Sequence, residues 1–202
     1  KGLLGVEGRE PTDEEIARVS SMKDIIFDGF LQAKDSGISG GDPAILVDEK
    51  FGIHVHEKAK EMGIKFAAPA EKSGQKVFDF EYGDNFGKKI EEVGADFVKI
   101  LVRWNPNDNS ETRQLQGERI KILSDWLDEN DKKFLLEFLV PATDEQLESV
   151  GGDQTRYDSE IRPRLAVQVV EEMRERGADP DIWKIEGLDT PEDCENISKV
   201  IK

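Results

Sequence analysis

Three short apolar segments of the chain each carry one ionisable residue near the centre. They are residues 97–102 with Lys99, residues 134–140 with Glu137, and residues 182–186 with Lys184. Such segments are typical of buried strands in parallel sheets, which are normally near-continuous runs of Val, Ile and Leu. Because burial removes hydration, a lysine in this position is expected to have a lowered pKa. Such an amine is a nucleophile near neutral pH and can form a Schiff base with a carbonyl substrate.

Strand-like and helix-like segments alternate along the chain. Strands are expected at residues 44–48, 64–70, 97–102, 134–140 and 182–186. Helices are expected at residues 12–34, 51–62, 84–93 and 111–129, with a loop and helix over 143–176 and a last helix from Thr190. Thr12 and Glu15 form a capping-box signature, and residues 36–43 are predicted to be a loop. This alternation predicts an α/β protein of parallel βα units, either an open sheet or an arc of a (β/α)8 barrel.

The position of the charges favours the barrel. Side chains alternate across a strand, so Lys99, Glu137 and Lys184 are expected on the face opposite to the one that contacts the helices. In an open sheet, helices would cover that face too, and the charges would be buried in apolar surroundings. In a barrel it is the interior, where a row of cation, anion and cation can meet a substrate. The alternative is a structural ion-pair row, although buried ion pairs stabilise proteins little.

Composition narrows the function classes. The 202 residues hold 28 basic and 44 acidic side chains, a net charge of −16, and no basic stretch that could bind nucleic acid. No segment is apolar enough to cross a membrane, and no signal peptide is visible, so we expect a cytoplasmic protein without membrane partners. One cysteine, Cys194, excludes an internal disulfide. No glycine-rich phosphate fingerprint follows any expected strand, which disfavours nucleotide binding.

Further candidates for substrate binding lie at the ends of the expected strands. Asp48 and Glu71 follow strands at the edge where active-site loops gather, although either could simply cap a loop. Arg103 follows the strand of Lys99 and could hold a phosphate or carboxylate through two hydrogen bonds. It could equally pair with Asp108.

The pair His54 and His56 would suggest zinc in a metal-dependent aldolase. Residues two apart on a helix face different directions, so we expect a solvated helix face and no metal or other cofactor.

These motifs together resemble a known family. The segments that carry the resemblance are residues 44–52, 70–74, 94–106, 134–138, 157–163 and 181–186. They are similar to the strand motifs of class I tagatose-bisphosphate aldolases. The similarity is greater to a domain related to the 2-deoxy-5-keto-gluconate 6-phosphate aldolases of inositol catabolism, a domain often fused to a sugar kinase.

The resemblance implies a (β/α)8 barrel with a Schiff-base lysine at Lys184, a second lysine at Lys99 and a glutamate at Glu137. It implies cleavage of a phosphorylated keto sugar, or keto sugar acid, to dihydroxyacetone phosphate and an aldehyde, without cofactor. The alternative is a non-catalytic barrel module accessory to a fused sugar kinase.

By this resemblance residues 1–202 form an incomplete arc of about five βα units, strands two to six. The first strand, with its carboxylate, and the last two units, which usually hold the substrate phosphate, are missing. We therefore expect the chain alone to be poorly soluble or inactive as an aldolase, and its open strand edges to favour association into homo-oligomers.

Overall fold

The computed structural model describes residues 9–37 and 43–201 of the chain. It shows an α/β protein in which every pairing given between strands is parallel. The chain divides into two compact units, residues 1–69 and 70–202. Among the described residues, no helix is both long enough and apolar enough to cross a membrane.

In residues 9–37 and 43–69, the first unit forms two helices and two strands. They are α1 (Asp13–Asp35), β1 (Ala44–Leu46), α2 (Glu49–Glu61) and β2 (Lys65–Pro69). The capping box predicted at Thr12 is confirmed: its side chain accepts from Glu15 N, and the Glu15 side chain accepts from Thr12 N. Strands β1 and β2 pair in parallel, with Ile45 opposite Phe66. Most of the predicted loop over residues 36–43 lies outside the described residues.

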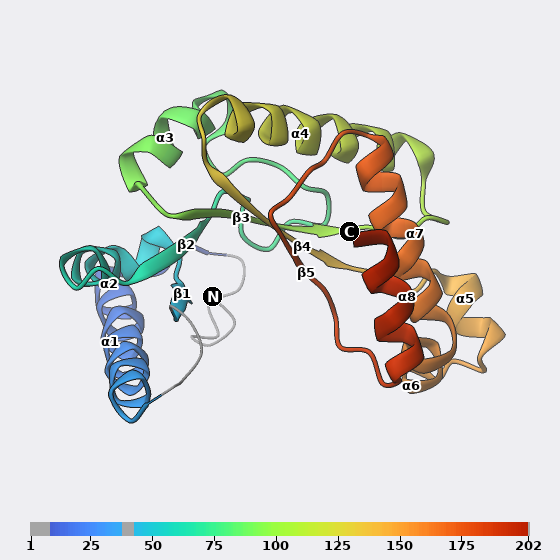
Figure 1. The fold of residues 1–202 in the computed structure, drawn as a ribbon, viewed down its shortest axis with the longest axis horizontal. Helices are drawn as coiled ribbons and strands as arrows, with labels where there is room; N and C mark the ends of the chain where they lie inside the picture. The colour runs from blue at the N-terminus through green and yellow to red at the C-terminus, as the bar shows by residue number, and fades with distance from the viewer. Residues whose placement is uncertain (1–8, 38–42, 202) are drawn as a thin grey trace. The chain divides into compact units, whose positions relative to one another are not determined.

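The described residues of the second unit form three strands, with helices before, between and after them. In chain order its elements are η2 (Gly83–Asn85), α3 (Phe86–Val93), β3 (Phe97–Arg103), α4 (Ser110–Glu129), β4 (Lys133–Leu139), α5 (Asp144–Ser149), α6 (Gln154–Arg156), the π-helix η3 (Tyr157–Ile161), α7 (Arg162–Glu175), β5 (Ile182–Lys184) and α8 (Pro191–Ile201). Strands β3, β4 and β5 are neighbours in chain order and all parallel (Figure 1). This order is the one predicted from the alternation of strands and helices.

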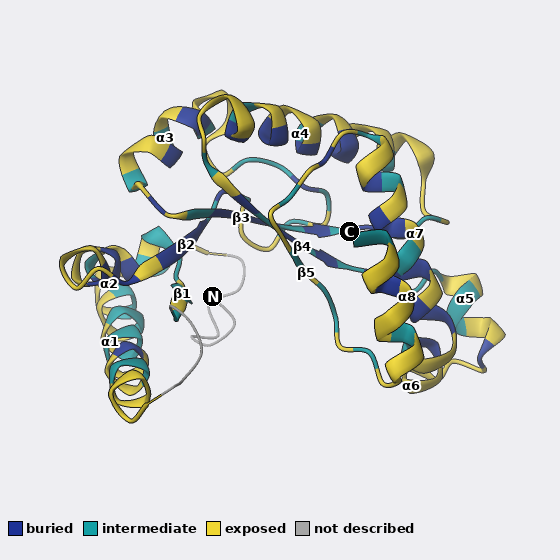
Figure 2. Ribbon diagram, in the orientation of Figure 1, coloured by how far each residue is buried: buried dark blue, intermediate teal, exposed yellow. Residues whose placement is uncertain are grey.

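One face of these three strands forms the core of the second unit. Val98, Ile100 and Leu136 on this face are at most 2% exposed and pack with apolar side chains of α4 and α7. The opposite face is only partly covered: Leu101, Leu135 and Leu139 are half-buried, and Ile182 is 39% exposed. Figure 2 shows that buried and intermediate residues are mixed along β3 and β4. The predicted division between a helix-facing side and a charged side of the sheet is therefore confirmed.

The region after β4 is more broken than the single loop and helix predicted over residues 143–176. Gly151 and Gly152 both have positive φ, which ends α5 and separates it from α6. A π-helical turn then begins at Tyr157, whose buried hydroxyl donates to Val140 O at 2.9 Å. Burial raises the pKa of Tyr157 to about 12, so this hydrogen bond persists at neutral pH.

Strand β5 is shorter than predicted and ends at Lys184 instead of residue 186. Glu186 explains the difference, because its carboxylate accepts from Val140 N at 2.8 Å, where the next strand residue would otherwise continue the ladder. Arg162 donates to the nearby Gly187 carbonyl at 3.1 Å. The chain just beyond Lys184 is thus fixed by side chains of its neighbours.

Candidate active site

Four side chains of the second unit form a continuous charged chain on the partly covered face of the sheet. Glu71 accepts from the Lys99 ammonium, with 2.6 Å between Oε1 and Nζ. The same Nζ lies 3.0 Å from Glu137 Oε2. The other oxygen of that carboxylate, Oε1, accepts directly from Lys184 Nζ. Glu137 therefore contacts both lysines, each through a different oxygen.

The strands set this geometry. Glu137 lies opposite Leu101 on β3 and opposite Lys184 on β5, so the carboxylate and the Lys184 amine stand side by side. Lys99 lies opposite Leu135, one step of the pleat nearer the N-terminal ends of the strands. The sequence predicted the row of cation, anion and cation but not this offset between the strands. The long lysine side chain nevertheless brings its ammonium to Glu137, and the three predicted catalytic residues do meet.

The two carboxylates have opposite pKa shifts. Burial raises the pKa of Glu71 above its ordinary value, against the attraction of Lys99, and its Oε2 is buried without a hydrogen-bond partner. Burial also acts to raise the pKa of Glu137, but the hydrogen bonds from Lys184 and Lys99 outweigh it and hold that pKa below the ordinary value. Paired groups with divergent pKa values are typical of acid–base sites.

The burial predicted for Lys184 is wrong for this structure. Its side chain is 50% exposed, whereas that of Lys99 is 8% exposed. The physical reason is that Lys184 lies on the partly covered face of β5, where its neighbour Ile182 is also 39% exposed.

Arg103 occupies the C-terminal end of β3, on the same face as Lys99. Its Nη1 donates to Gln75 O at 2.7 Å, and it forms no ion pair with any carboxylate among residues 9–37 and 43–201. The predicted alternative, a pair with Asp108, is not what the structure shows. Asp108 instead accepts from Asn109 N, and its carbonyl accepts from Arg113.

The remaining candidates lie in the first unit. Asp48 caps α2 by accepting from Phe51 N at 2.9 Å, and it also pairs with Lys23, which matches the capping alternative. His54 contacts Asp24 at 3.2 Å, while buried His56 donates from Nε2 to the carbonyl of Val47. The two imidazoles have separate partners, and within the described part of the chain no three His, Cys, Asp or Glu side chains gather as a metal site would require.

The sequence reasoning missed two glutamines beside Arg103. Gln75 supplies the carbonyl for Arg103, and its side-chain Nε2 is buried without a hydrogen-bond partner. Gln116 on α4 accepts from Phe78 N and donates to Arg103 O, at 2.8 and 3.0 Å. Glutamines carry no charge and follow no motif here, so no signal in the sequence distinguished them.

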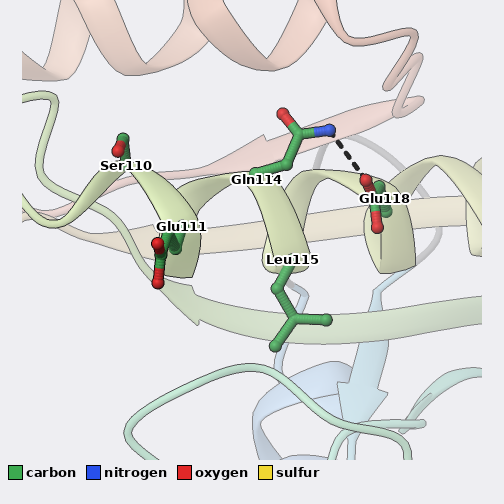
Figure 3. A pocket seen from close by; sticks show the side chains of 5 residues that line it. All are labelled: Ser110, Glu111, Gln114, Leu115 and Glu118. Atoms are coloured by element: carbon green, nitrogen blue, oxygen red, sulfur yellow. Dashed lines mark hydrogen bonds between the residues drawn. The ribbon is translucent and has the colours of Figure 1, made fainter.

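A hollow along α4 offers no comparable chemistry. Its lining comes from one helix: Ser110, Glu111, Gln114, Leu115 and Glu118 (Figure 3). Gln114 Nε2 donates to Glu118 across it at 2.7 Å. The charged chain through Lys99 and Glu137 lies on the opposite side of the sheet, so we regard that chain as the candidate site.

The fold and site thus define an α/β protein with parallel strands and a cluster of two lysines and two carboxylates on one sheet face. The chain matches, over residues 6–202, the family described as "Uncharacterized protein conserved in bacteria (DUF2090)", and it belongs to that family.

No curated protein sequence matches the chain. A solved structure, that of Cgl0159 from Corynebacterium glutamicum, is similar with a TM-score of 0.48 and 17% sequence identity. The match covers 80% of this chain and 52% of Cgl0159, so the chain spans about half the length of that protein.

Proposed function

We propose that this chain carries the imine-forming site of a class I aldolase, on strands that are an arc of a (β/α)8 barrel. The observation that carries the proposal is the direct contact between Lys184 Nζ and Glu137 Oε1. It places a nucleophile beside its proton acceptor, which is the minimal arrangement for covalent catalysis by an amine. Buried Lys99 binds the other oxygen of Glu137 and holds the carboxylate in orientation.

The first chemical step is imine formation. Glu137 takes a proton from the Lys184 ammonium, and the free amine attacks the substrate carbonyl carbon, forming an N–C bond while the carbonyl π electrons move to oxygen. One of the two protons on the attacking nitrogen passes to this oxygen to give the neutral carbinolamine. Glu137 then returns its proton to that hydroxyl, which leaves as water, and the nitrogen lone pair forms the iminium.

Carbon–carbon cleavage follows from the iminium. The base Glu137 removes the proton of the hydroxyl on the second carbon from the iminium carbon. The bond between that carbinol carbon and the carbon next to the iminium breaks, and its electron pair forms the enamine C=C bond as the C=N π pair moves to nitrogen. An aldehyde leaves and an enamine remains, which is protonated on carbon and hydrolysed by water. Glu71, whose pKa is raised, is placed on the far side of Lys99 as a second proton reservoir.

The substrate class proposed is a phosphorylated keto sugar or keto sugar acid, and the reaction class is that of a carbon–carbon lyase. Support comes from the geometry of the Lys99, Glu137 and Lys184 side chains and from the sequence resemblance. The alternative of a barrel module accessory to a kinase requires no chemistry at Lys184, so one experiment separates the two.

The test is borohydride reduction of the chain in the presence of dihydroxyacetone phosphate or a neutral ketose. We expect covalent addition at Lys184, located by peptide mass mapping, and its loss in Lys184→Met. The matched control is Lys133→Met, because Lys133 also lies on a strand and pairs with a carboxylate, that of Asp181 at 2.8 Å. Addition at Lys133, or no addition with any ketone or ketose, would eliminate the mechanism and leave the accessory-module alternative.

A further inference from the structure

Arg103 is a cation that has no acidic partner within residues 9–37 and 43–201, although the chain carries a net charge of −16. Two other arginines of the second unit do have acidic partners: Arg113 binds Glu172, and Arg119 lies 3.5 Å from Asp79. Among the described residues the one hydrogen-bond partner of the Arg103 guanidinium is the Gln75 carbonyl. A guanidinium has five N–H donors, so most of its donor capacity is unused.

Gln75 adds a second unused donor close by. Its Oε1 accepts from Asp79 N at 2.6 Å, which fixes the side-chain amide, yet Nε2 is buried with no acceptor in the described structure. A buried N–H without a partner costs about 1–3 kcal/mol, so such a group in a native protein calls for an explanation. The Gln75 carbonyl binds Arg103, hence the free amide lies within one glutamine side chain of the guanidinium.

The loop that carries Gln75 is held in place by α4. Gln116 joins Phe78 N of the loop to the Arg103 carbonyl of the strand. Arg119 Nη1 donates to the Phe78 carbonyl at 2.5 Å. Lys72 N and Asp79 O close the loop on itself at 2.9 Å. The two donor groups are thus preorganised, which reduces the entropy lost when a ligand binds.

The strand register relates Arg103 to the proposed imine. Arg103 lies opposite Leu139, one pleat step beyond the level of Leu101, Glu137 and Lys184 toward the C-terminal ends. With strands about 4.8 Å apart and about 3.3 Å per residue, the Cα atoms of Arg103 and Lys184 are roughly 12 Å apart. Both side chains rise from the same face, so their tips can hold the two ends of a short sugar chain.

We propose that Arg103 and the amide of Gln75 form a subsite for the anionic end of the substrate, a phosphate or a carboxylate, while Lys184 takes its carbonyl. This inference rests on the proposed function for the role of Lys184, but the anion site itself stands on the unused donors. A planar guanidinium fork with an added amide donor suits either oxyanion.

The first experiment measures the binding of inorganic phosphate and of acetate to the whole chain by NMR titration. Arg103→Met should lower the affinity for the preferred anion at least about tenfold, and Gln75→Leu should lower it by a smaller factor. Arg103→Lys should retain part of the affinity, since it keeps the charge but not the two parallel donors of the guanidinium. The control is Arg156→Met, the same charge change at an exposed arginine that pairs with Glu160. Equal weakening in Arg103→Met and Arg156→Met would overturn the subsite.

The second measurement is imine trapping with dihydroxyacetone phosphate, pyruvate and neutral dihydroxyacetone. Wild type should trap one of the anionic ketones at a lower concentration than the neutral one, and which anion is preferred distinguishes phosphate from carboxylate. Arg103→Met should lose this preference and trap the neutral ketone as wild type does. If Arg103→Met still prefers the anionic ketone, the subsite is overturned and the imine mechanism stands. If the wild-type chain traps no ketone, the imine mechanism is overturned, and the titration alone then decides whether the anion subsite exists.

Discussion

Replacement of Lys99 by methionine is the sharpest test of how the charged chain is held together. The ammonium lies 2.6 Å from Glu71 and 3.0 Å from Glu137, and its side chain is 8% exposed. At an effective dielectric constant of about 20, each contact supplies about 6 kcal/mol of gross attraction, much of it offset by lost hydration. Removal of one partner from a buried ion pair typically costs about 3–5 kcal/mol.

We expect the free energy of unfolding of Lys99→Met to fall by about 3 kcal/mol at pH 8. The value lies at the lower end of the range because Glu137 keeps its contact with Lys184, whereas Glu71 loses its one cationic partner. Urea unfolding followed by circular dichroism gives this number directly. The Lys133→Met variant removes the same charge from an exposed site and should change the unfolding free energy far less.

The pH dependence has a definite sign. Burial already raises the pKa of Glu71, and loss of Lys99 raises it further. A carboxyl whose folded pKa exceeds the unfolded value of about 4.3 binds protons preferentially in the folded state, so stability falls as pH rises through the folded pKa. The loss of unfolding free energy in Lys99→Met, relative to wild type, should therefore be largest at pH 8 and become smaller toward pH 5.

Two results would refute this reasoning. One is a deficit at pH 8 no larger than that of Lys133→Met, and the other is a deficit that grows on acidification. The double variant Lys99→Met/Glu71→Gln should regain part of the lost stability, because it removes the uncompensated charge. Failure to regain any would show that packing of the Lys99 stem, and not its charge, is what matters.

Two further predictions concern packing and pH. A Cβ on Gly87 of α3 would lie 2.7 Å from the Trp126 ring, so Gly87→Ala should destabilise the protein by about 1–3 kcal/mol in urea unfolding. Gly29→Ala in α1 meets nothing within 4 Å and should instead stabilise by about 0.5–1 kcal/mol; the same sign at both sites would contradict the contact. Burial lowers the pKa of His56, so protonation opposes folding and stability should fall as pH drops below about 6.5. His56→Gln should flatten that part of the stability curve, and an unchanged slope would assign it to other groups.

Much of the fold could be predicted because its signals are local. Apolar runs near residues 97–102 and 134–140 gave strands β3 and β4 to within one residue at each end, and Thr12 gave the start of α1. The alternation of side chains placed Lys99 and Glu137 on one face, and the structure agrees.

The parts that could not be predicted depend on contacts distant in sequence. The early end of β5 follows from the hydrogen bond that Val140 N donates to the Glu186 carboxylate. The half-exposed side chain of Lys184 follows from the incomplete cover of the charged face of β5. The register offset of Lys99 depends on how the strands align, which a pattern of period two does not reveal. Gln75 could not be predicted because the sequence does not show which buried side-chain N–H groups lack an acceptor.

Gln116 gives α4 an influence beyond that of a helix covering a sheet. Its one amide spans from the end of β3 to the loop of Gln75, so a change on this helix would move the two anion donors relative to each other while the Lys184 contact stays fixed. Natural or engineered variation at position 116 would then retune which acid a chain accepts without touching the bond-making step. Selectivity and chemistry would be separately adjustable.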